Sequence, residues 1–147
     1  MLMATFKKIR EMNTRSTNLL SLRPEIPSAR ITDDMSKDER FQNQTLRPII
    51  KLQNLLIISV FKNYIGKHKN RFYELTLQKR IEYIENAVQK DIKFRNSLKG
   101  LIIGQFTVEE YETYIQNSSA LNKRMMNMVI ERLKDQIQLL ELAALVQ

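Results

Sequence analysis

Apolar residues recur at helical spacing along most of the chain. In one segment they repeat at intervals of four, three and four, at Leu77, Ile81, Ile84 and Val88. From Ala120 to about Leu145, apolar residues fall on one arc of a helix, and lysine, asparagine, glutamate and glutamine fall on the opposite arc. We therefore predict two amphipathic helices here, and the longer one should close a bundle.

Capping residues mark where helices are expected to begin. Ser36 with Glu39, and Thr107 with Glu110, form the pattern of a capping box, in which each side chain bonds to the other residue's backbone N–H. Gly104 suits the left-handed position that often ends a helix. Single caps are expected at three further places: Thr76, Asp91 and a serine of the sequence Asn117-Ser118-Ser119.

A proline divides the most apolar part of the chain. A short helix should run from Ser36 to about Asn43. Pro48 lacks the N–H that a helix interior requires, so it should lie in the first turn of a new helix that begins near Thr45 or Leu46. That helix should continue to about Lys67. It is apolar around much of its circumference, which predicts a central position in the bundle.

The predicted fold is all-α: a single-domain bundle of five or six helices with an extended N-terminal arm. No segment shows the alternation of a strand, and no internal repeat is visible. Residues 1–15 are a basic extension, for which a frayed terminus is favoured over a short amphipathic helix. Residues 16–35 contain Pro24 and Pro27 and are predicted to form the arm, and residues 36–147 the helical bundle domain.

The composition limits the chemistry that this chain can carry out. It has no cysteine and one histidine, His68, which leaves no thiolate site and no clustered histidine ligands. Neither a Walker-type loop nor a dinucleotide-binding glycine pattern occurs. We therefore predict no metal, no cofactor and no catalytic residue, and we favour a protein that is not an enzyme.

The length of the apolar runs in the sequence indicates where in the cell the protein is expected. The longest of them, Leu55–Phe61, is far shorter than the roughly 20 residues that a membrane-spanning helix needs. Charged residues interrupt the first fifteen positions, where a secretory signal would have an unbroken apolar core. We therefore expect a cytoplasmic protein without a membrane span.

The positive charge is concentrated in one region. The chain carries a formal net charge of +8, and its basic residues are densest between residues 62 and 99. Such a band can bind nucleic acid or another polyanion, although lysine and arginine also stabilise helix C-termini. The candidate contacts within this band are Lys90, Lys93, Arg95 and Lys99.

Three functional hypotheses remain open from the sequence. The first is a non-enzymatic interaction module that binds a protein partner or forms a homo-oligomer. Its contacts would be the arm from Arg23 to Ile31 and a polar helix junction, whose residues also suit a capping and linking role. The second is nucleic-acid or polyanion binding through the basic band, and the third is a small-molecule enzyme. The junction residues are Asn117, Ser118, Ser119, Asn122 and Arg124.

Three stretches of the sequence resemble a family of short, uncharacterised bacterial proteins. They are LRPIIKLQN (46–54), KFRNSLKGLIIGQFTVEEY (93–111) and NSSALNKRMMNMVIERL (117–133). Members of that family often carry the label glyoxalase, and a true glyoxalase implies a βαβββ fold with paired histidine and glutamate ligands. Because this chain has one histidine and no predicted strand, we do not expect it to have that activity or to share any site residue with a glyoxalase.

Overall fold

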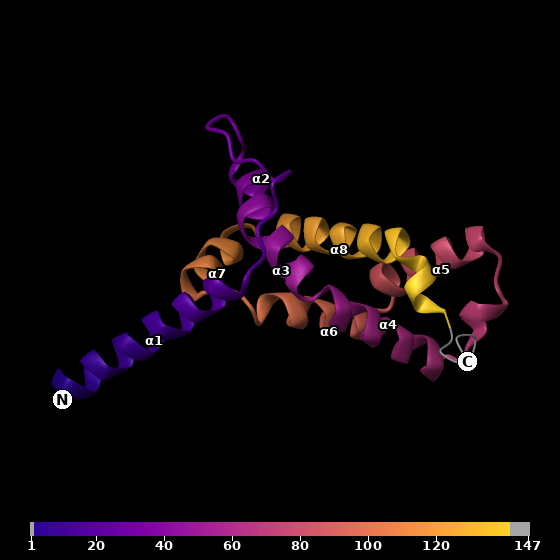
Figure 1. Ribbon diagram of the computed structural model, residues 1–147, viewed down its shortest axis with the longest axis horizontal. Helices are drawn as coiled ribbons and strands as arrows, with labels where there is room; N and C mark the ends of the chain where they lie inside the picture. The colour runs from indigo at the N-terminus through magenta and orange to yellow at the C-terminus, as the bar shows by residue number, and fades with distance from the viewer. Residues whose placement is uncertain (1, 142–147) are drawn as a thin grey trace.

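The apolar sides of the helices meet in one core, so the chain forms an all-α bundle. The computed structural model describes residues 2–141, apart from the side chains of residues 9–13, and every regular element in this range is a helix (Figure 1). The α-helices are α1 (Leu2–Leu22), α2 (Lys37–Phe41), α3 (Arg47–Leu52), α4 (Asn54–Lys67), α5 (Leu77–Lys90), α6 (Ile92–Ile103), α7 (Val108–Tyr114) and α8 (Ser118–Asp135). A π-helical turn, η1 (Gln42–Leu46), and three 3-10 turns, η2 (Arg71–Glu74), η3 (Ile115–Asn117) and η4 (Ile137–Leu140), connect them.

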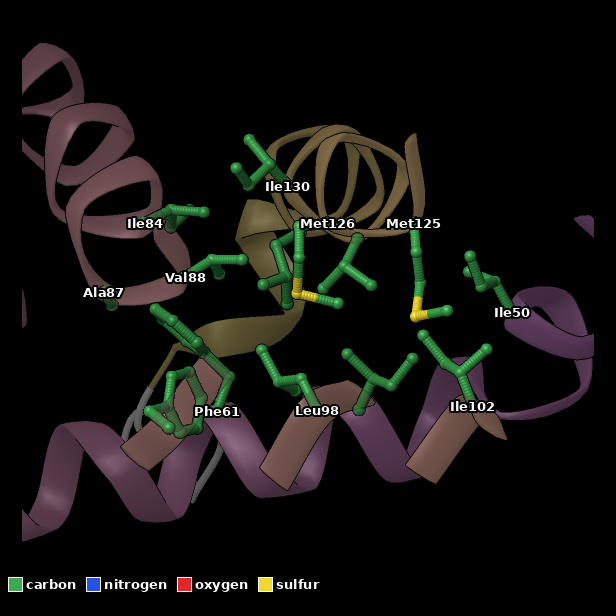
Figure 2. Close-up of a cluster of buried hydrophobic side chains, with 14 of the residues drawn as sticks. Ile50, Phe61, Ile84, Ala87, Val88, Leu98, Ile102, Met125, Met126 and Ile130 are labelled. Atoms are coloured by element: carbon green, nitrogen blue, oxygen red, sulfur yellow. The ribbon is translucent and has the colours of Figure 1, made fainter. Parts of the chain in front are cut away.

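The core lies between α4, α5, α6 and α8. Figure 2 shows α8 above α4 and α6, with α5 at one end and Ile50 of α3 at the other. Phe61 is completely buried near the α5 end, where its ring lies 5.9–6.2 Å from the rings of four other aromatic residues. The other buried side chains labelled in Figure 2 are Ile84, Ala87, Val88, Leu98, Ile102, Met125, Met126 and Ile130.

The predicted capping residues are confirmed at four helix starts. The side chains of Ser36, Thr76 and Asp91 each accept a hydrogen bond from the backbone N–H three residues later. Thr107 and Glu110 form both hydrogen bonds of a capping box. The apolar stripe of α5 is buried at Ile84 and Val88, but Leu77 is exposed.

Pro48 lies in the first turn of a new α-helix as predicted, because α3 begins at Arg47, but the predicted break before that helix is absent. The backbone stays helical from Lys37 to Leu52, because η1 widens the helix just before the proline. The N–H of Arg47 bonds to the carbonyl of Gln42, five residues earlier, and this π-type turn makes room for the proline ring. The helix breaks instead at Gln53, and α4 then runs to Lys67 as predicted.

The long C-terminal helix ends earlier than predicted. It begins at Ser118, where no side chain caps it, and it ends at Asp135 rather than near Leu145. Gln136 forms two amide hydrogen bonds of 2.7 Å with Asn54, which lies in a distant part of the sequence. This pair turns the backbone away from the helix, an effect that the local sequence pattern does not reveal. The predicted helical positions after Glu141 lie outside the described residues.

The N-terminal segment is more helical than predicted. Residues 2–22 form the continuous helix α1, so the extended arm begins at Arg23 and not at residue 16. Pro24 explains this boundary, because a proline disfavours helical geometry in the residue before it. For residues 2–15, the helical alternative is therefore the one that the structure shows.

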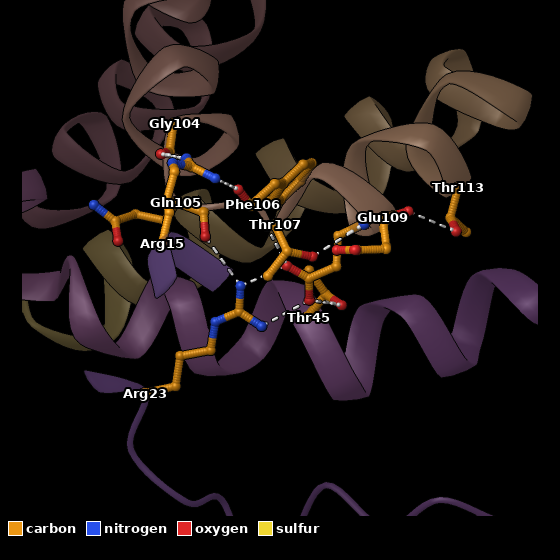
Figure 3. Close-up of polar contacts among 10 residues, drawn as sticks. Arg15, Arg23, Thr45, Gly104, Gln105, Phe106, Thr107, Glu109 and Thr113 are labelled. Carbon is orange, nitrogen blue, oxygen red and sulfur yellow. Dashed lines mark hydrogen bonds and ion pairs between the residues drawn. The ribbon is translucent and has the colours of Figure 1, made fainter. Parts of the chain in front are cut away.

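Two arginines dock the C-terminal half of α1 onto the loop between α6 and α7 (Figure 3). Arg15 donates to the carbonyls of Phe106 and Gly104, at 2.8 and 3.2 Å. Arg23 forms a bidentate ion pair with Glu110, at 2.6 and 2.7 Å, and both side chains are largely buried. We call the Arg23–Glu110 pair the clasp.

Candidate anion-binding groove

A groove of about 660 Å³ opens at the end of the bundle where α4 and α5 finish. Helix α4 ends at Lys67, the chain turns into η2, and α5 returns to end at Lys90 beside the start of α6. The residues that line the groove come from all of these segments: Tyr64, Lys67, His68, Lys69, Arg71, Tyr83, Asn86, Ala87, Lys90 and Asp91.

The lining of the groove is strongly cationic. Lys67, Lys69, Arg71 and Lys90 contribute four positive charges, and the one acid in the lining is Asp91. Within residues 2–141, none of these four cations forms an ion pair with a described acidic side chain. Lys67 and Lys90 lie in the last turns of α4 and α5, where they also stabilise the helix ends. The field in the groove is therefore positive, because Asp91 offsets only one of these four charges.

A second cavity of about 370 Å³ continues the groove on the other side of Tyr64. It shares Tyr64, Lys67, His68 and Asp91 with the first cavity and adds Lys93 from the first turn of α6. The two cavities together form one surface, which we call the basic groove. Its length allows contact with more than one anionic group.

The loop that carries Lys69 has an unusual backbone. The N–H groups of Lys69 and Asn70 bond to the carbonyls of Gly66 and Ile65, which is the hydrogen-bond pattern of a Schellman motif. Lys69 occupies the left-handed position of that motif, with φ of 61°, where glycine is the usual residue. Gly104, for which the sequence predicted the left-handed conformation, has φ of −60° instead. The left-handed helix end thus lies in the basic groove and carries a lysine.

Aromatic side chains belong to the lining of the basic groove. The rings of Tyr64 and His68 stack with centroids 4.1 Å apart, and Tyr64 donates a hydrogen bond of 2.9 Å to Asp91. Burial, followed by this bond to Asp91, raises the pKa of Tyr64 above its ordinary range. The hydroxyl of Tyr83 is buried and has no hydrogen-bond partner among the described residues. Phe94 packs against Tyr64 as well, also with centroids 4.1 Å apart, so His68 and Phe94 cover the faces of the tyrosine ring and the exposed ring of His68 is the one open to a ligand.

Asp91 remains ionised in this cationic surrounding. Its carboxylate accepts a hydrogen bond from the backbone N–H of Phe94, which is the largest of the effects that lower its pKa. The hydroxyl of Tyr64 and the nearby His68 lower the pKa further. Asp91 therefore caps α6 and holds Tyr64 in place, and its negative charge offsets one of the cations.

Of the four predicted contacts in the basic band, two line the basic groove and two lie elsewhere. Lys90 and Lys93 line the basic groove. Arg95 and Lys99 lie roughly 200° and 240° around α6 from Lys93, on a different face of the helix. Both are half-buried and neither lines the basic groove. The band is therefore not one continuous surface.

The residues of the polar helix junction have partners within the protein. Asn117 donates to Asp38, Asn122 accepts a 2.5 Å hydrogen bond from Tyr114, and Arg124 donates to Gln42. Ser118 is half-buried and Ser119 is exposed. Asn117 and Arg124 thus hold α8 against α2 and η1, and a role of the junction in binding a partner stays a prediction.

The sequence analysis missed most of the groove residues. Lys67, Lys69 and Arg71 belonged to the predicted basic band but were not chosen as contacts, and Tyr64 was not singled out. The local sequence points away from this loop, because Gly66 would be the expected left-handed residue at the helix end, whereas the left-handed residues are Lys69 and Asn70.

The described residues contain neither a metal site nor a membrane-spanning helix. No group of three or more histidine, aspartate or glutamate side chains in this range could hold a metal ion. No helix in the described part of the chain combines the length and the apolar character needed to cross a bilayer. No family model, curated protein or solved structure matches the chain. The resemblance to the bacterial family therefore stays an expectation from the sequence.

Proposed function

We propose that the protein binds a single-stranded nucleic acid at the basic groove. The observation that supports this proposal is that four cations without ion pairs line one groove together with the rings of Tyr64, His68 and Tyr83. Proteins that bind single strands combine a cationic track for phosphates with aromatic faces for bases. The groove volume of about 660 Å³ also lies within the range of sites that hold a small ligand or one nucleotide unit.

The arrangement suits a single strand better than a duplex. The cations lie around a concave groove rather than along an exposed helix, and they surround the half-buried rings of Tyr64 and Tyr83. A duplex hides its bases and would contact only the rim of such a groove. The exposed ring of His68 can stack on an unpaired base.

The first experiment measures binding of a fluorescent mixed-sequence single strand across a salt series. Four neutralised phosphates give a slope of about −3 for log affinity against log salt, or roughly a 50-fold loss between about 50 and 200 mM salt. In the Lys67→Gln/Lys90→Gln variant, two of these contacts are lost, so the slope should become shallower by about 1.4. Affinity at low salt should fall by about tenfold or more.

The matched control is the Arg95→Gln/Lys99→Gln variant. It removes the same amount of charge from the same basic band, but from residues outside the basic groove. We expect it to bind as the wild type does, within about twofold. Equal weakening by both variants would show that net charge alone matters, and absence of binding at low salt would overturn the proposal.

The remaining functional hypotheses stay predictions. A protein-interaction module that uses the junction would compete with the intramolecular bonds of Asn117 and Asn122. An enzyme would need a reactive group in the groove. His68 lines the groove, but the cavity of about 660 Å³ has no serine, threonine or cysteine among the described residues of its lining for this histidine to activate. Polyanion binding is therefore the function that the geometry supports best.

A further inference from the structure

Helix α1 projects from the bundle at the end opposite the basic groove (Figure 1). Its C-terminal half is docked by Arg15 and by the clasp, whereas its N-terminal half extends away from the other helices. Every side chain from Leu2 to Lys8 is exposed. This free half of α1 has no role in the core or in the basic groove.

The free half of α1 is both apolar and basic. Leu2, Met3 and Phe6 are 71%, 85% and 60% exposed, although large apolar side chains are normally withdrawn from water. The sequence of α1 contains four lysines or arginines and one acid, Glu11. Lys7 and Lys8 lie directly after Phe6 in the part whose side chains are described. Exposed apolar residues beside several cations are typical of helices that lie on anionic membranes.

We propose that α1 binds to an anionic lipid surface. Leu2 and Phe6 share one face of the helix because they are four residues apart, and Met3 lies about 100° around from Leu2. The apolar side is therefore broad, which suits insertion into a plane better than a narrow groove on a partner. The excess of cations complements anionic headgroups and disfavours pairing with α1 of a second copy, because two such helices would repel each other.

The geometry allows this contact without unfolding the bundle. The docked half of α1 keeps its hydrogen bonds to the α6–α7 loop while the free half lies on the surface. Leu2, Met3 and Phe6 would enter the boundary between headgroups and acyl chains, and Lys7 and Lys8 would remain among the phosphates. The proposal is independent of nucleic-acid binding, because it uses neither the residues nor the position of the basic groove.

The test is sedimentation of the full chain with phosphatidylcholine vesicles that contain phosphatidylglycerol, compared with phosphatidylcholine alone. We expect binding to the anionic vesicles only. Replacement of both lysines, Lys7→Gln/Lys8→Gln, should weaken it about 30-fold. The Leu2→Gln/Phe6→Gln variant should weaken it about tenfold or more. These exposed residues contribute little to folding, so both variants should keep the stability of the wild type.

Two controls separate α1 from the rest of the surface. Leu77→Gln removes an apolar side chain of similar exposure from α5 and should leave vesicle binding unchanged. The Lys67→Gln/Lys90→Gln variant removes charge from the basic groove and should also bind vesicles normally. Loss of vesicle binding in this groove variant, or full binding by both α1 variants, would overturn the proposal.

A direct reporter is available because the chain contains no tryptophan. The Phe6→Trp variant carries one tryptophan on the free half of α1, and its fluorescence should shift to the blue on addition of anionic vesicles. A Leu77→Trp variant carries the same reporter on α5 and should show no shift. A Phe6→Trp spectrum that stays unchanged, or binding of neutral and anionic vesicles alike, contradicts the proposal.

Discussion

Lys69 illustrates how one residue connects local backbone geometry with the proposed binding site. A left-handed conformation costs a non-glycine residue roughly 1–2 kcal/mol, and the end of α4 nevertheless carries a lysine there. The same conformation places Lys69 in the lining of the basic groove beside Lys67 and Arg71. Unfavourable backbone geometry of this kind is often found at functional sites, where binding rather than stability explains the residue.

Replacing Lys69 by glycine should weaken binding without lowering the stability of the fold. Glycine adopts positive φ without steric cost, so Lys69→Gly should leave the free energy of unfolding unchanged or raise it by up to about 1 kcal/mol. The same variant loses one phosphate contact, so its salt slope for a single strand should become shallower by about 0.7. Urea unfolding and the salt series measure these two quantities. A clear loss of stability would show that the lysine side chain supports the turn.

The role of a residue can be predicted well from the sequence where its interaction partner lies close along the chain. Ser36, Thr76, Asp91 and Thr107 were all identified as caps, because a cap bonds to an N–H only three residues away. The basic groove depends instead on side chains from separate segments. Their common location follows from how α4, α5 and α6 pack, which periodicity alone does not determine.

At the scale of elements, the clasp determines how α1 is attached. Glu110 belongs to the capping box of α7, and its carboxylate also accepts hydrogen bonds from Arg23 and Thr45. One side chain therefore connects the start of α7, the segment after α1 and the π turn η1. The sequence predicted the capping box but not these two partners, because Arg23 and Thr45 lie far from Glu110 along the chain.

Removing the arginine of the clasp should release α1. In Arg23→Met, a similar length of side chain remains, but Glu110 keeps a largely buried charge without its partner. Loss of one partner of a buried pair costs about 3 kcal/mol, so amide protection should fall over residues 14–22 in hydrogen exchange. Glu25→Gln, which changes an exposed carboxylate of the same arm, is the control and should exchange as the wild type does.

The clasp should also respond to acid. Burial alone would raise the pKa of Glu110, but hydrogen bonds from Arg23, Thr107 and Thr45 outweigh it and lower the pKa below the ordinary value of 4.5. The ionised carboxylate therefore stabilises the fold above pH 4.5, and this contribution is lost as the pH falls through the lower folded-state pKa. In Arg23→Met the folded-state pKa should rise, so Glu110 contributes less stability at neutral pH and the weakened fold should reach its acid-unfolding midpoint at a higher pH. Acid titrations followed by circular dichroism test this; identical midpoints would contradict it.

For the whole molecule, burial in the core determines which apolar residues are essential for stability and which are not. The sequence predicted that α4 would be surrounded by other helices, and it does bury Ile57, Phe61 and Ile65. It leaves Leu55 and Leu56 exposed, however, so that prediction is only partly confirmed. The apolar pattern identified the helix, but the faces that it buries depend on which neighbours pack against it.

Two substitutions in α4 should therefore have very different effects. Phe61→Ala removes a completely buried ring that contacts Phe72, Tyr83 and Phe94, and it should reduce the free energy of unfolding by about 3–5 kcal/mol. Leu55→Ala, at an exposed position of the same helix, should change it by less than about 0.5 kcal/mol. Urea unfolding measures both; similar losses would place Leu55 in the core.

The projection of α1 away from the bundle also affects how the protein would behave with two ligands at once. An α-helix of 21 residues is a rod of about 30 Å, so the free half of α1 lies well away from the basic groove at the other end. Occupation of one end leaves the other accessible, and the two binding free energies should add without coupling. Where a strand lies near an anionic bilayer, attachment by either end raises the effective concentration of the other. The protein would then act as a bivalent tether whose avidity exceeds the affinity of each end.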